Sequence, residues 1–559
     1  MRRRMFYLAI VFGLLFVSGL VWFVVTANSR KLSQPPPGPA GLFDTDQDGL
    51  SDAREQELST NPGEPDSDFD GLTDREEVEV YTTQPLNADS DADGFVDGVE
   101  VRGGYNPKGT NLLLSLLNAL RKLVPRPLLV VYHAILNWVS QALYGFPTRK
   151  LVTIGVTGTT GKTSVISYTS ALLEAAGYKT GYISTATIKV GSRTRLNPLK
   201  MTMPGRWTLA RILRKIVRSG ARYALIETSS QGLEQYRHLG IAYDVALFTN
   251  LTPEHIEAHG SFEKYRQAKE RLFAGLSRTH RKSNVKKIIV VNCDDPNAHH
   301  FLRYDADEKW GYSLESTTTQ ALPNMIRPTS YSCGPNGINF TLRDSKGNEI
   351  KVHSKLVGIF NLYNMLAAVA VAESQGVTLS VIQSSLQKLE AAPGRMEPIN
   401  LGQPFTVIVD YAHVPESLEL VYKTLRLQLA PGKKLIAVLG SAGGGRDVAK
   451  RPKLGTLAAR LADFSVITNE DPYDEDPHTI IWQVVGGLKA AGKQEGSDYV
   501  TLLDRREAIG RALKKAQPGD IVVITGKGCE PVIMSKGGRR IPHDDREVVR
   551  KQLRELQRS

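Results

Sequence analysis

The chain has 559 residues, of which 41% are hydrophobic and 23% charged, an ordinary globular composition with room for three or four domains. Its net charge of +12 is unevenly distributed along the chain. Residues 44–100 hold nineteen acidic and two basic residues, a net charge of −17, so the rest of the chain carries +29. Such a basic remainder, without interleaved aromatic residues, favours an anionic substrate or a membrane surface, and no nucleic-acid partner is expected. The three cysteines form no Cys-x-x-Cys pair, which argues against a disulfide framework or a zinc site.

Residues 1–30 are predicted to be a transmembrane anchor. Residues 5–27 carry no charge, and a segment of about 20 apolar residues spans a bilayer. The segment is also longer than the usual apolar core of a signal peptide, so we favour an uncleaved helix, although residues 25–27 would pass as a cleavage site. Three arginines precede the segment and two basic residues follow it, which places the N-terminus in the cytoplasm and the rest outside. Residues 31–43, which include SQPPPGPAG, are predicted to be a flexible linker.

Residues 44–107 contain three copies of an acidic loop. Each copy reads Asp-x-Asp-x-Asp-Gly and continues with Asp at the ninth position and Glu at the twelfth. A hard cation needs about six or seven oxygen ligands, and the loop needs glycine at its sharp turn, so the spacing predicts Ca²⁺ sites. The predicted ligands are Asp44, Asp46, Asp48, Asp52, Glu55, Asp66, Asp68, Asp70, Asp74, Glu77, Asp89, Asp91, Asp93, Asp97 and Glu100. The segment resembles thrombospondin type 3 repeats and dockerin-like modules, which usually work outside the cell; a merely solvated acidic linker would not repeat in register.

Residues 108–150 are rich in leucine and aromatic residues, with basic residues between them. This composition predicts an amphipathic helix, which either lies on a membrane or covers the next domain. We favour the packing role.

Residues 152–164 read VTIGVTGTTGKTS, a buried-strand pattern that breaks into glycines. A strand that ends in such a turn before a helix leaves backbone N–H groups free to bind a polyphosphate. Lys162 adds a positive charge for the phosphates, and the Thr163 hydroxyl can ligate Mg²⁺. The general pattern has a further glycine where this chain has Val156, and Gly158 takes over the turn. The predicted phosphate-binding residues are Gly158, Thr159, Thr160, Gly161, Lys162, Thr163 and Ser164.

From residue 151 onward, short apolar runs alternate with helical stretches. The runs YALIET, DVALFTN, KKIIVVN, TVIVDYAH, KLIAVLG, DFSVITN and DIVVITG each end in a polar or glycine-rich cluster. Parallel strands present functional groups in this way at their carboxyl ends. We therefore predict an α/β fold of two doubly wound domains, residues 151–395 with the P-loop and residues 396–559 with a Rossmann-like sheet.

Three chemical groups follow these strands: Glu227 after YALI, His255 after ALFTN, and Lys269 in the next helical stretch. With the P-loop, these motifs resemble the Mur ligases over residues 151–559, nearest to the tripeptide-synthetase branch. The motifs in chain order are GTTGKT, ETSSQGL, FTNLTPEHIEAHGSFEKYRQAK, VNCDDPN, GIFNLYNMLAA, APGRMEPI, VDYAHVPESL, GGGRDVAKRP, NEDPYDEDP and GKGCE. Folylpolyglutamate synthases share the fold but usually read Gly-Lys-Gly-Ser where this chain reads GKTS.

The resemblance implies an ATP- and Mg²⁺-dependent amide ligase of EC 6.3.2 type. ATP would phosphorylate a substrate carboxylate, and an incoming amine would attack the acyl-phosphate. The implied catalytic residues are Lys162, Glu227, His255 and Lys269. The implied Mg²⁺ ligands are Thr163, Glu227, His255 and Lys269, the lysine as a carbamate because a neutral amine is a poor ligand for a hard cation. Further ATP contacts are implied at Asn361, Arg395, Asp410 and His413, and substrate contacts at Thr202, Ser229, Arg446, Glu470, Asp471, Tyr473, Gly526 and Glu530.

Three departures from the family pattern concern the substrate. The N-terminal domain that grips uridine diphosphate has no counterpart in the sequence, so the UDP link of the acceptor is an open question. Residues 201–204 match the acceptor-sugar motif only in part, and Gln231 replaces the usual histidine. The diaminopimelate-specific branch reads Asp-Asn-Pro-Arg where residues 470–473 of this chain read Glu-Asp-Pro-Tyr. In that branch the motif binds the distal carboxylate of diaminopimelate, so the absence of its arginine argues against diaminopimelate as the amino acid added.

The sequence therefore predicts a ligase that adds an amino acid to a peptidoglycan precursor peptide, a muropeptide or related acidic peptide, in cell-wall biogenesis, cell shape and division. Two alternatives stay open: a related ligase with an acceptor not linked to UDP, or a calcium-binding surface protein with a decayed ligase domain. The localisation signals conflict, because the arginines and calcium loops place the ligase outside, whereas ATP and Mur-type substrates are cytoplasmic. We expect a single-pass membrane protein with a cytoplasmic ligase.

Overall fold

The computed structural model describes residues 43–46, 48–68, 70, 72–91, 96–103, 107–108, 126–197, 201–252, 259–315, 322–334, 337–445 and 448–557. The chain divides into two compact units, Met1–Tyr132 with Met534–Ile541, and His133–Ile533 with Pro542–Ser559. The predicted anchor at residues 5–27 lies outside the described residues. Among the helices that are described, none combines the length and apolar character needed to cross a bilayer.

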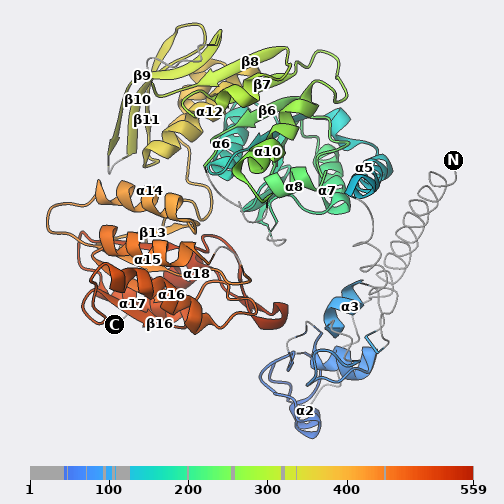
Figure 1. The fold of residues 1–559 in the computed structure, drawn as a ribbon, viewed down its shortest axis with the longest axis vertical. Helices are drawn as coiled ribbons and strands as arrows, with labels where there is room; N and C mark the ends of the chain where they lie inside the picture. Colours follow the sequence, from blue (N-terminus) through green and yellow to red (C-terminus); the bar gives the residue numbers. More distant parts are fainter. Residues whose placement is uncertain are drawn as a thin grey trace. The chain divides into compact units, whose positions relative to one another are not determined.

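The first unit is built on the acidic repeats (Figure 1). Each loop leads into a short helix: α2 (Asp52–Leu58), η1 (Glu76–Tyr81) and α3 (Asp97–Gly103). Gly49, in the sharp turn of the first loop, has φ +95°, which glycine adopts without strain. The apolar core of this unit includes Leu50 and Leu72, one after each of the first two loops. Carboxylates occupy much of the remaining interior.

The second unit begins with an eleven-stranded sheet in the order β11-β10-β9-β8-β7-β6-β1-β5-β2-β3-β4. The strands from β2 through β9 in this order are parallel, as the sequence predicts, whereas β3–β4 and β10–β11 extend the two edges as antiparallel strands. Their bounds are β1 (Val152–Thr157), β2 (Thr180–Ile183), β3 (Thr187–Val190), β4 (Arg193–Leu196), β5 (Tyr223–Glu227), β6 (Val245–Phe248), β7 (Ile288–Asn292), β8 (Glu308–Tyr312), β9 (Asn324–Gly334), β10 (Gly337–Arg343) and β11 (Glu349–Ser354).

Helices cover both faces of this sheet. Alternate residues of one strand enter opposite cores, so Leu225 joins the cluster under α6 and α12, while Ala224 and Ile226 join the cluster under α7 and α10. Burial on both faces explains the continuous apolar runs of β1 and β5. The helices are α6 (Lys162–Ala175), α7 (Arg206–Arg218), α8 (Ser230–Glu234), α10 (Phe262–Leu276), α11 (Ala298–Leu302), α12 (Ile359–Ser374) and α13 (Leu379–Leu386).

A six-stranded sheet in the order β12-β13-β17-β14-β15-β16 follows. It is parallel except for β12, and the predicted domain boundary at residue 395 directly precedes that strand. The strands are β12 (Glu397–Pro398), β13 (Thr406–Asp410), β14 (Leu435–Leu439), β15 (Phe464–Thr468), β16 (Tyr499–Leu502) and β17 (Ile521–Thr525). One face packs against α14 (Pro415–Arg426), α15 (Lys450–Leu461) and α16 (Pro477–Ala490), and the other against α17 (Arg505–Lys515) and α18 (Asp545–Leu556). A small hairpin pairs β18 (Val532–Met534) with β19 (Arg540–Pro542) around η3 (Lys536–Gly538).

The leucine-rich segment is helical over α5 (Arg126–Leu143) and is followed by η2 (Pro147–Lys150), while residues 109–125 lie outside the described residues. The helix contacts the neighbouring domain, but it does so through a polar face. Among its residues 135–143, the buried ones are Asn137, Ser140 and Gln141, and Asn137 donates a hydrogen bond to the carbonyl oxygen of Tyr236. Over this described part the favoured packing role is therefore carried by polar side chains.

Candidate active site

The loop between β1 and α6 depends on two glycines. Gly158 has φ +148° and Gly161 has φ +81°, a region where other L-residues are strained. A Cβ atom on Gly158 would lie 1.9 Å from the Thr249 hydroxyl oxygen, and one on Gly161 would lie 2.4 Å from Oδ1 of Asn364. Neighbouring side chains therefore approach the loop so closely that only glycine fits.

Asn250 holds the loop from the adjacent strand. Its carbonyl oxygen accepts a hydrogen bond from the Thr159 amide at 2.9 Å, and its Oδ1 accepts bonds from the amide and hydroxyl of Thr160 at 3.0 and 3.2 Å. The Thr249 hydroxyl donates to the Thr160 carbonyl at 2.7 Å. Sequence analysis did not single out Asn250, although the polar pair Thr249 and Asn250 directly after the run DVALF was an available signal. Only the pairing of β6 with β1 brings it to the loop.

Thr163 and Glu227, both predicted Mg²⁺ ligands, meet directly. The Thr163 hydroxyl donates to Oε2 of Glu227 at 2.8 Å, and the amide and hydroxyl of Thr185 donate to the two carboxylate oxygens at 2.8 Å each. The hydroxyls of Thr185 and Thr202 lie 2.9 Å apart, which connects a predicted substrate residue to the same cluster. Buried carboxylate and hydroxyl oxygens are donors that suit Mg²⁺. Thr185 was missed by sequence analysis.

Two lysines converge on one carbonyl group of the loop. Lys162 Nζ donates to the carbonyl oxygens of Gly158 and Thr159 at 3.0 and 2.6 Å, and Lys269 Nζ donates to that of Gly158 at 2.7 Å. Lys269 is buried, with its ammonium 4.4 Å from the ring centroid of Tyr265. Two cations beside the N-terminus of α6 make this an anion-binding position. The third predicted catalytic group, His255, lies outside the described residues.

His259, which sequence analysis did not assign, is buried close to Lys269. Its Nε2 lies 3.1 Å from the Ser230 hydroxyl, and its Nδ1 lies 3.1 Å from the carboxylate of Glu234. Burial lowers the pKa of His259, opposed by Glu234 and assisted by the charge of Lys269. Ser229, a predicted substrate contact, caps α8 by accepting the Gly232 amide at 3.2 Å.

Asn361 lies on the side of the P-loop helix. Its Oδ1 accepts the Tyr168 hydroxyl of α6 at 3.0 Å, and its Nδ2 donates to the Val357 carbonyl at 2.8 Å. Asn364, one turn further along α12, reaches Gly161 as described above. The predicted ATP contact at Asn361 therefore belongs to the same group of residues as the loop.

The remaining predicted ATP contacts, Arg395, Asp410 and His413, lie close together where the C-terminal domain begins. The buried carboxylate of Asp410 accepts two backbone amides at 2.7 Å each. Burial raises the pKa of Asp410, and the charge of Arg395 opposes that shift. The Arg395 guanidinium lies 4.5 Å from the ring centroid of Tyr411, whose carbonyl is 2.9 Å from Nδ1 of His413. The Tyr411 hydroxyl donates to Glu530 at 3.2 Å, which extends the cluster to a predicted substrate residue.

Lys527 is the centre of the second half of this cluster. It is fully buried and donates to Asp471 at 2.7 Å and to Glu530 at 2.6 Å, and these two carboxylates raise its pKa against the effect of burial. Oε2 of Glu470 is buried without a hydrogen-bond partner among the described residues, and a Cβ on Gly526 would lie 2.5 Å from it. Sequence analysis quoted GKGCE but did not assign its lysine.

Of the two other predicted substrate residues, only Tyr473 lies in the described part of the chain. Tyr473 has φ +52° and packs against Gly444, whose Cβ would lie 3.2 Å from its ring. Arg446 lies outside the described residues. The structure therefore brings Glu470, Asp471, Gly526 and Glu530 together and leaves Arg446 unplaced.

Family models match most of the chain. The model of the Mur ligase middle domain matches residues 156–372, and that of the Mur ligase glutamate ligase domain matches residues 394–528. The bacterial TSP3 repeat matches residues 44–62 and 66–88.

Individual relatives agree with these matches. A UDP-N-acetylmuramoyl-L-alanyl-D-glutamate–2,6-diaminopimelate ligase of Geobacillus kaustophilus is 40% identical over 417 residues, which cover 75% of this chain and 82% of that protein. A UDP-N-acetylmuramyl-tripeptide synthetase of a Roseiflexus species is 38% identical over 444 residues, 78% and 85% of the two chains. A solved structure of a diaminopimelate ligase of the first kind aligns with TM-score 0.51 at 32% identity, covering 73% of this chain and 79% of that one.

Proposed function

The chain belongs to the Mur ligase family, and we propose that its described sites carry out that family's reaction as follows. The protein is an ATP-dependent ligase that adds an amino acid to a peptidoglycan precursor peptide, as the sequence predicts. The observation that carries the mechanism is the direct contact of Thr163 with Glu227 beside a loop on which Lys162 and Lys269 converge.

The P-loop side activates the carboxylate. Backbone N–H groups at the start of α6 and the Lys162 ammonium hold the phosphates of ATP. Thr163 and Glu227 would hold Mg²⁺, which would supply positive charge to offset that of the transferred phosphoryl group. A carboxylate oxygen of the precursor attacks the γ-phosphorus, and ADP leaves. Thr202, through its contact with Thr185, positions the precursor near this metal site.

The C-terminal cluster receives the incoming amino acid. Its α-ammonium group is cationic, so we assign its contact to the carboxylates of Asp471 and Glu530, which Lys527 holds in place. After losing a proton, the amine nitrogen attacks the acyl carbon, the amide bond forms, and phosphate leaves. Relatives carry diaminopimelate in their names, but Tyr473 stands where that branch has arginine. We therefore propose an amino acid without a second carboxylate.

Carbamylation of Lys269 fits its position. The amine is buried beside the loop and already contacts the Gly158 carbonyl. A carbamate, formed when the amine adds carbon dioxide and loses a proton, would supply oxygen ligands for Mg²⁺, whereas the amine alone is a poor ligand for a hard cation. We include this modification in the proposal.

Calcium is proposed for the repeats. Ligand oxygens of Asp44, Asp46 and Asp48 lie within 4.8 Å of one another, as do those of Asp66, Asp68 and Asp70, and those of Asp70, Glu77 and Asp97. Glu55 and Glu77 are fully buried, and both oxygens of the first and one of the second have no hydrogen-bond partner among the described residues. Burial, with the charges of nearby aspartates, raises the pKa of Glu55 to about 7 and of Glu77 to about 9. Buried carboxylate oxygens of this kind fit Ca²⁺.

For localisation, we propose a membrane-anchored protein with a cytoplasmic ligase. The P-loop and the residues around it support this location, because ATP is scarce outside the cell, and the positive-inside bias is only three residues against two. Protease treatment of intact cells tests the orientation. Cleavage of the ligase domain without lysis would show that it is outside.

The central experiment measures ADP release and amide formation by the full chain, with UDP-linked and non-UDP muropeptides and a panel of amino acids. Lys162→Ala is expected to abolish turnover, because it removes the positive charge nearest the phosphoryl group. The exposed Lys179, replaced by alanine, is the matched control and should retain full activity. More than a few per cent of activity in Lys162→Ala would reject the P-loop assignment, and calcium-dependent binding without ATP turnover in the parent protein would favour a decayed ligase.

A further inference from the structure

Helix α7 carries a stripe of four basic residues on its outer face. Arg211, Arg214, Lys215 and Arg218 are spaced three and four residues apart, so they lie along one side of the helix, while Leu209 and Leu213 are buried on the other side. No carboxylate in the described part of the chain forms an ion pair with any of the four. The proposed ligase mechanism uses none of them.

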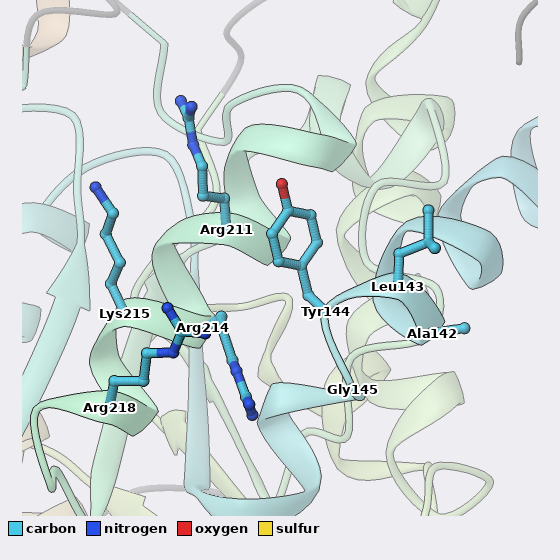
Figure 2. Close-up of a pocket in the computed structure, with 8 residues that line it drawn as sticks. All are labelled: Ala142, Leu143, Tyr144, Gly145, Arg211, Arg214, Lys215 and Arg218. Carbon is cyan, nitrogen blue, oxygen red and sulfur yellow. The ribbon is translucent and has the colours of Figure 1, made fainter. Parts of the chain in front are cut away.

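The stripe faces the end of α5 across an open pocket of about 570 Å³. Figure 2 shows the four basic side chains coming from α7 and the residues Ala142, Leu143, Tyr144 and Gly145 coming from the end of α5. Gly145 has φ +71°, and a Cβ atom there would lie 3.8 Å from a guanidinium nitrogen of Arg214. The pocket therefore has a cationic wall and a wall with apolar and aromatic groups.

Over residues 135–143, where its side chains are described, α5 exposes apolar groups. Trp138 is 58% exposed and Leu143 is 61% exposed, whereas Asn137, Ser140 and Gln141 are buried. A helix on a water-facing surface normally has the opposite arrangement. The Trp138 ring packs edge-on against Phe146 at 5.5 Å, and the Arg149 guanidinium lies 4.0 Å from the Phe146 ring centroid. Aromatic rings flanked by arginines are typical of the boundary between lipid headgroups and acyl chains.

We propose that Trp138 and Leu143, together with the basic stripe of α7, dock on an anionic phospholipid surface. The stripe supplies charge complementary to headgroup phosphates, and the two exposed apolar side chains supply groups that enter the acyl boundary. The chain itself points to this occupant, because the leucine-rich residues 109–125 directly precede α5 and the apolar residues 5–27 lie further upstream. The contact holds the ligase domain against the membrane through its own surface, independently of any anchor and of the reaction it catalyses.

The test measures amide hydrogen exchange of Arg206–Arg218 and of residues 138–145 in the full chain. Vesicles of phosphatidylcholine alone are compared with vesicles that also contain phosphatidylglycerol. Insertion of the apolar residues 5–27 contributes equally to binding in both cases, so a difference between the two reports on the anionic headgroups. Protection of both segments is expected only with phosphatidylglycerol, and raised salt should weaken it. Equal protection on the neutral vesicles would overturn the proposal. Equal protection by soluble pyrophosphate without vesicles would also overturn it, in favour of a soluble phosphate ligand.

Variants separate the two halves of the surface. The triple variant Arg211→Gln/Lys215→Gln/Arg218→Gln, at exposed positions, should lose the protection. The control Arg511→Gln/Lys514→Gln/Lys551→Gln removes three equally exposed charges from the C-terminal domain and should retain it. Trp138→Gln leaves the stripe intact and should reduce the protection, because a purely electrostatic site would not need the ring. Retention of full protection in the triple variant or in Trp138→Gln would refute the docking surface.

Discussion

Gly158→Ala tests whether close packing, and not only local turn chemistry, fixes the phosphate-binding loop. The added Cβ would stand 1.9 Å from the Thr249 hydroxyl oxygen and 3.1 Å from the backbone nitrogen and oxygen of Asn250. The side chain of Thr249 must then rotate away and give up its hydrogen bond to the Thr160 carbonyl.

The cost has three parts. A non-glycine residue at φ +148° costs about 1–2 kcal/mol in backbone strain. The lost hydrogen bond adds about 1 kcal/mol, and overpacking against the Asn250 backbone adds about 1–3 kcal/mol. We therefore expect a destabilisation of about 3–6 kcal/mol. Turnover should fall by about 100-fold or more, because the Gly158 carbonyl orders both Lys162 and Lys269.

Gly177→Ala is the matched control. Gly177 also has a positive φ, +85°, but a Cβ there meets nothing within 4 Å, so only the strain of about 1–2 kcal/mol remains. Urea-induced unfolding followed by circular dichroism gives the two free energies, and ATP turnover is measured on the same samples. In a double-mutant cycle, Thr249→Ala should recover about 1–2 kcal/mol in the Gly158→Ala background, because it removes the clashing oxygen. Strict additivity in that cycle, or equal destabilisation by the two glycine variants, would refute the packing argument.

Three further predictions concern other parts of the chain. Lys269→Ala should be nearly inactive and partly rescued by acetate, which replaces the carbamate oxygens. Acetate should not rescue Lys162→Ala. Wild-type activity in Lys269→Ala would show that Lys269 is not part of the site. Chelation of Ca²⁺ should allow trypsin to cut at Arg54 and Arg75, the two basic residues of 44–100, without loss of ligase activity. Identical digestion with and without chelator would refute the assignment of Ca²⁺ to the repeats. Burial, assisted by a nearby arginine, lowers the pKa of His238 from 6.5 to about 4. As the pH falls, the histidine is therefore protonated in the unfolded chain before it is protonated in the folded protein, and the free energy of unfolding should fall by about 2–3 kcal/mol between pH 6.5 and 4. His238→Gln should flatten this pH dependence in unfolding measurements, and an unchanged slope would contradict the assignment.

The parallel core of both sheets was predictable because each strand is an apolar run that ends in a polar cluster. The antiparallel strands at the edges of the eleven-stranded sheet could not be predicted. All the side chains of β4 are exposed or half-buried and polar apart from its last residue, so the sequence carries no apolar signal for that strand. Its pairing is decided by the sheet, because β3 pairs with β2 on one side and offers its other edge to β4.

What the sequence determined by itself is local chemistry: the strand, glycine turn and helix of residues 152–164, and the register of the acidic loops, each of which needs only neighbouring residues. Glu227 and Lys269 were assigned from sequence through family resemblance. Only the tertiary structure placed Asn250 and Thr185 around the loop, because strand order, not chain order, puts their strands near β1. The same holds for the membrane-facing surface. Its basic stripe and Leu143 at the end of α5 lie about seventy residues apart in the chain, and the tertiary structure brings them to the same pocket.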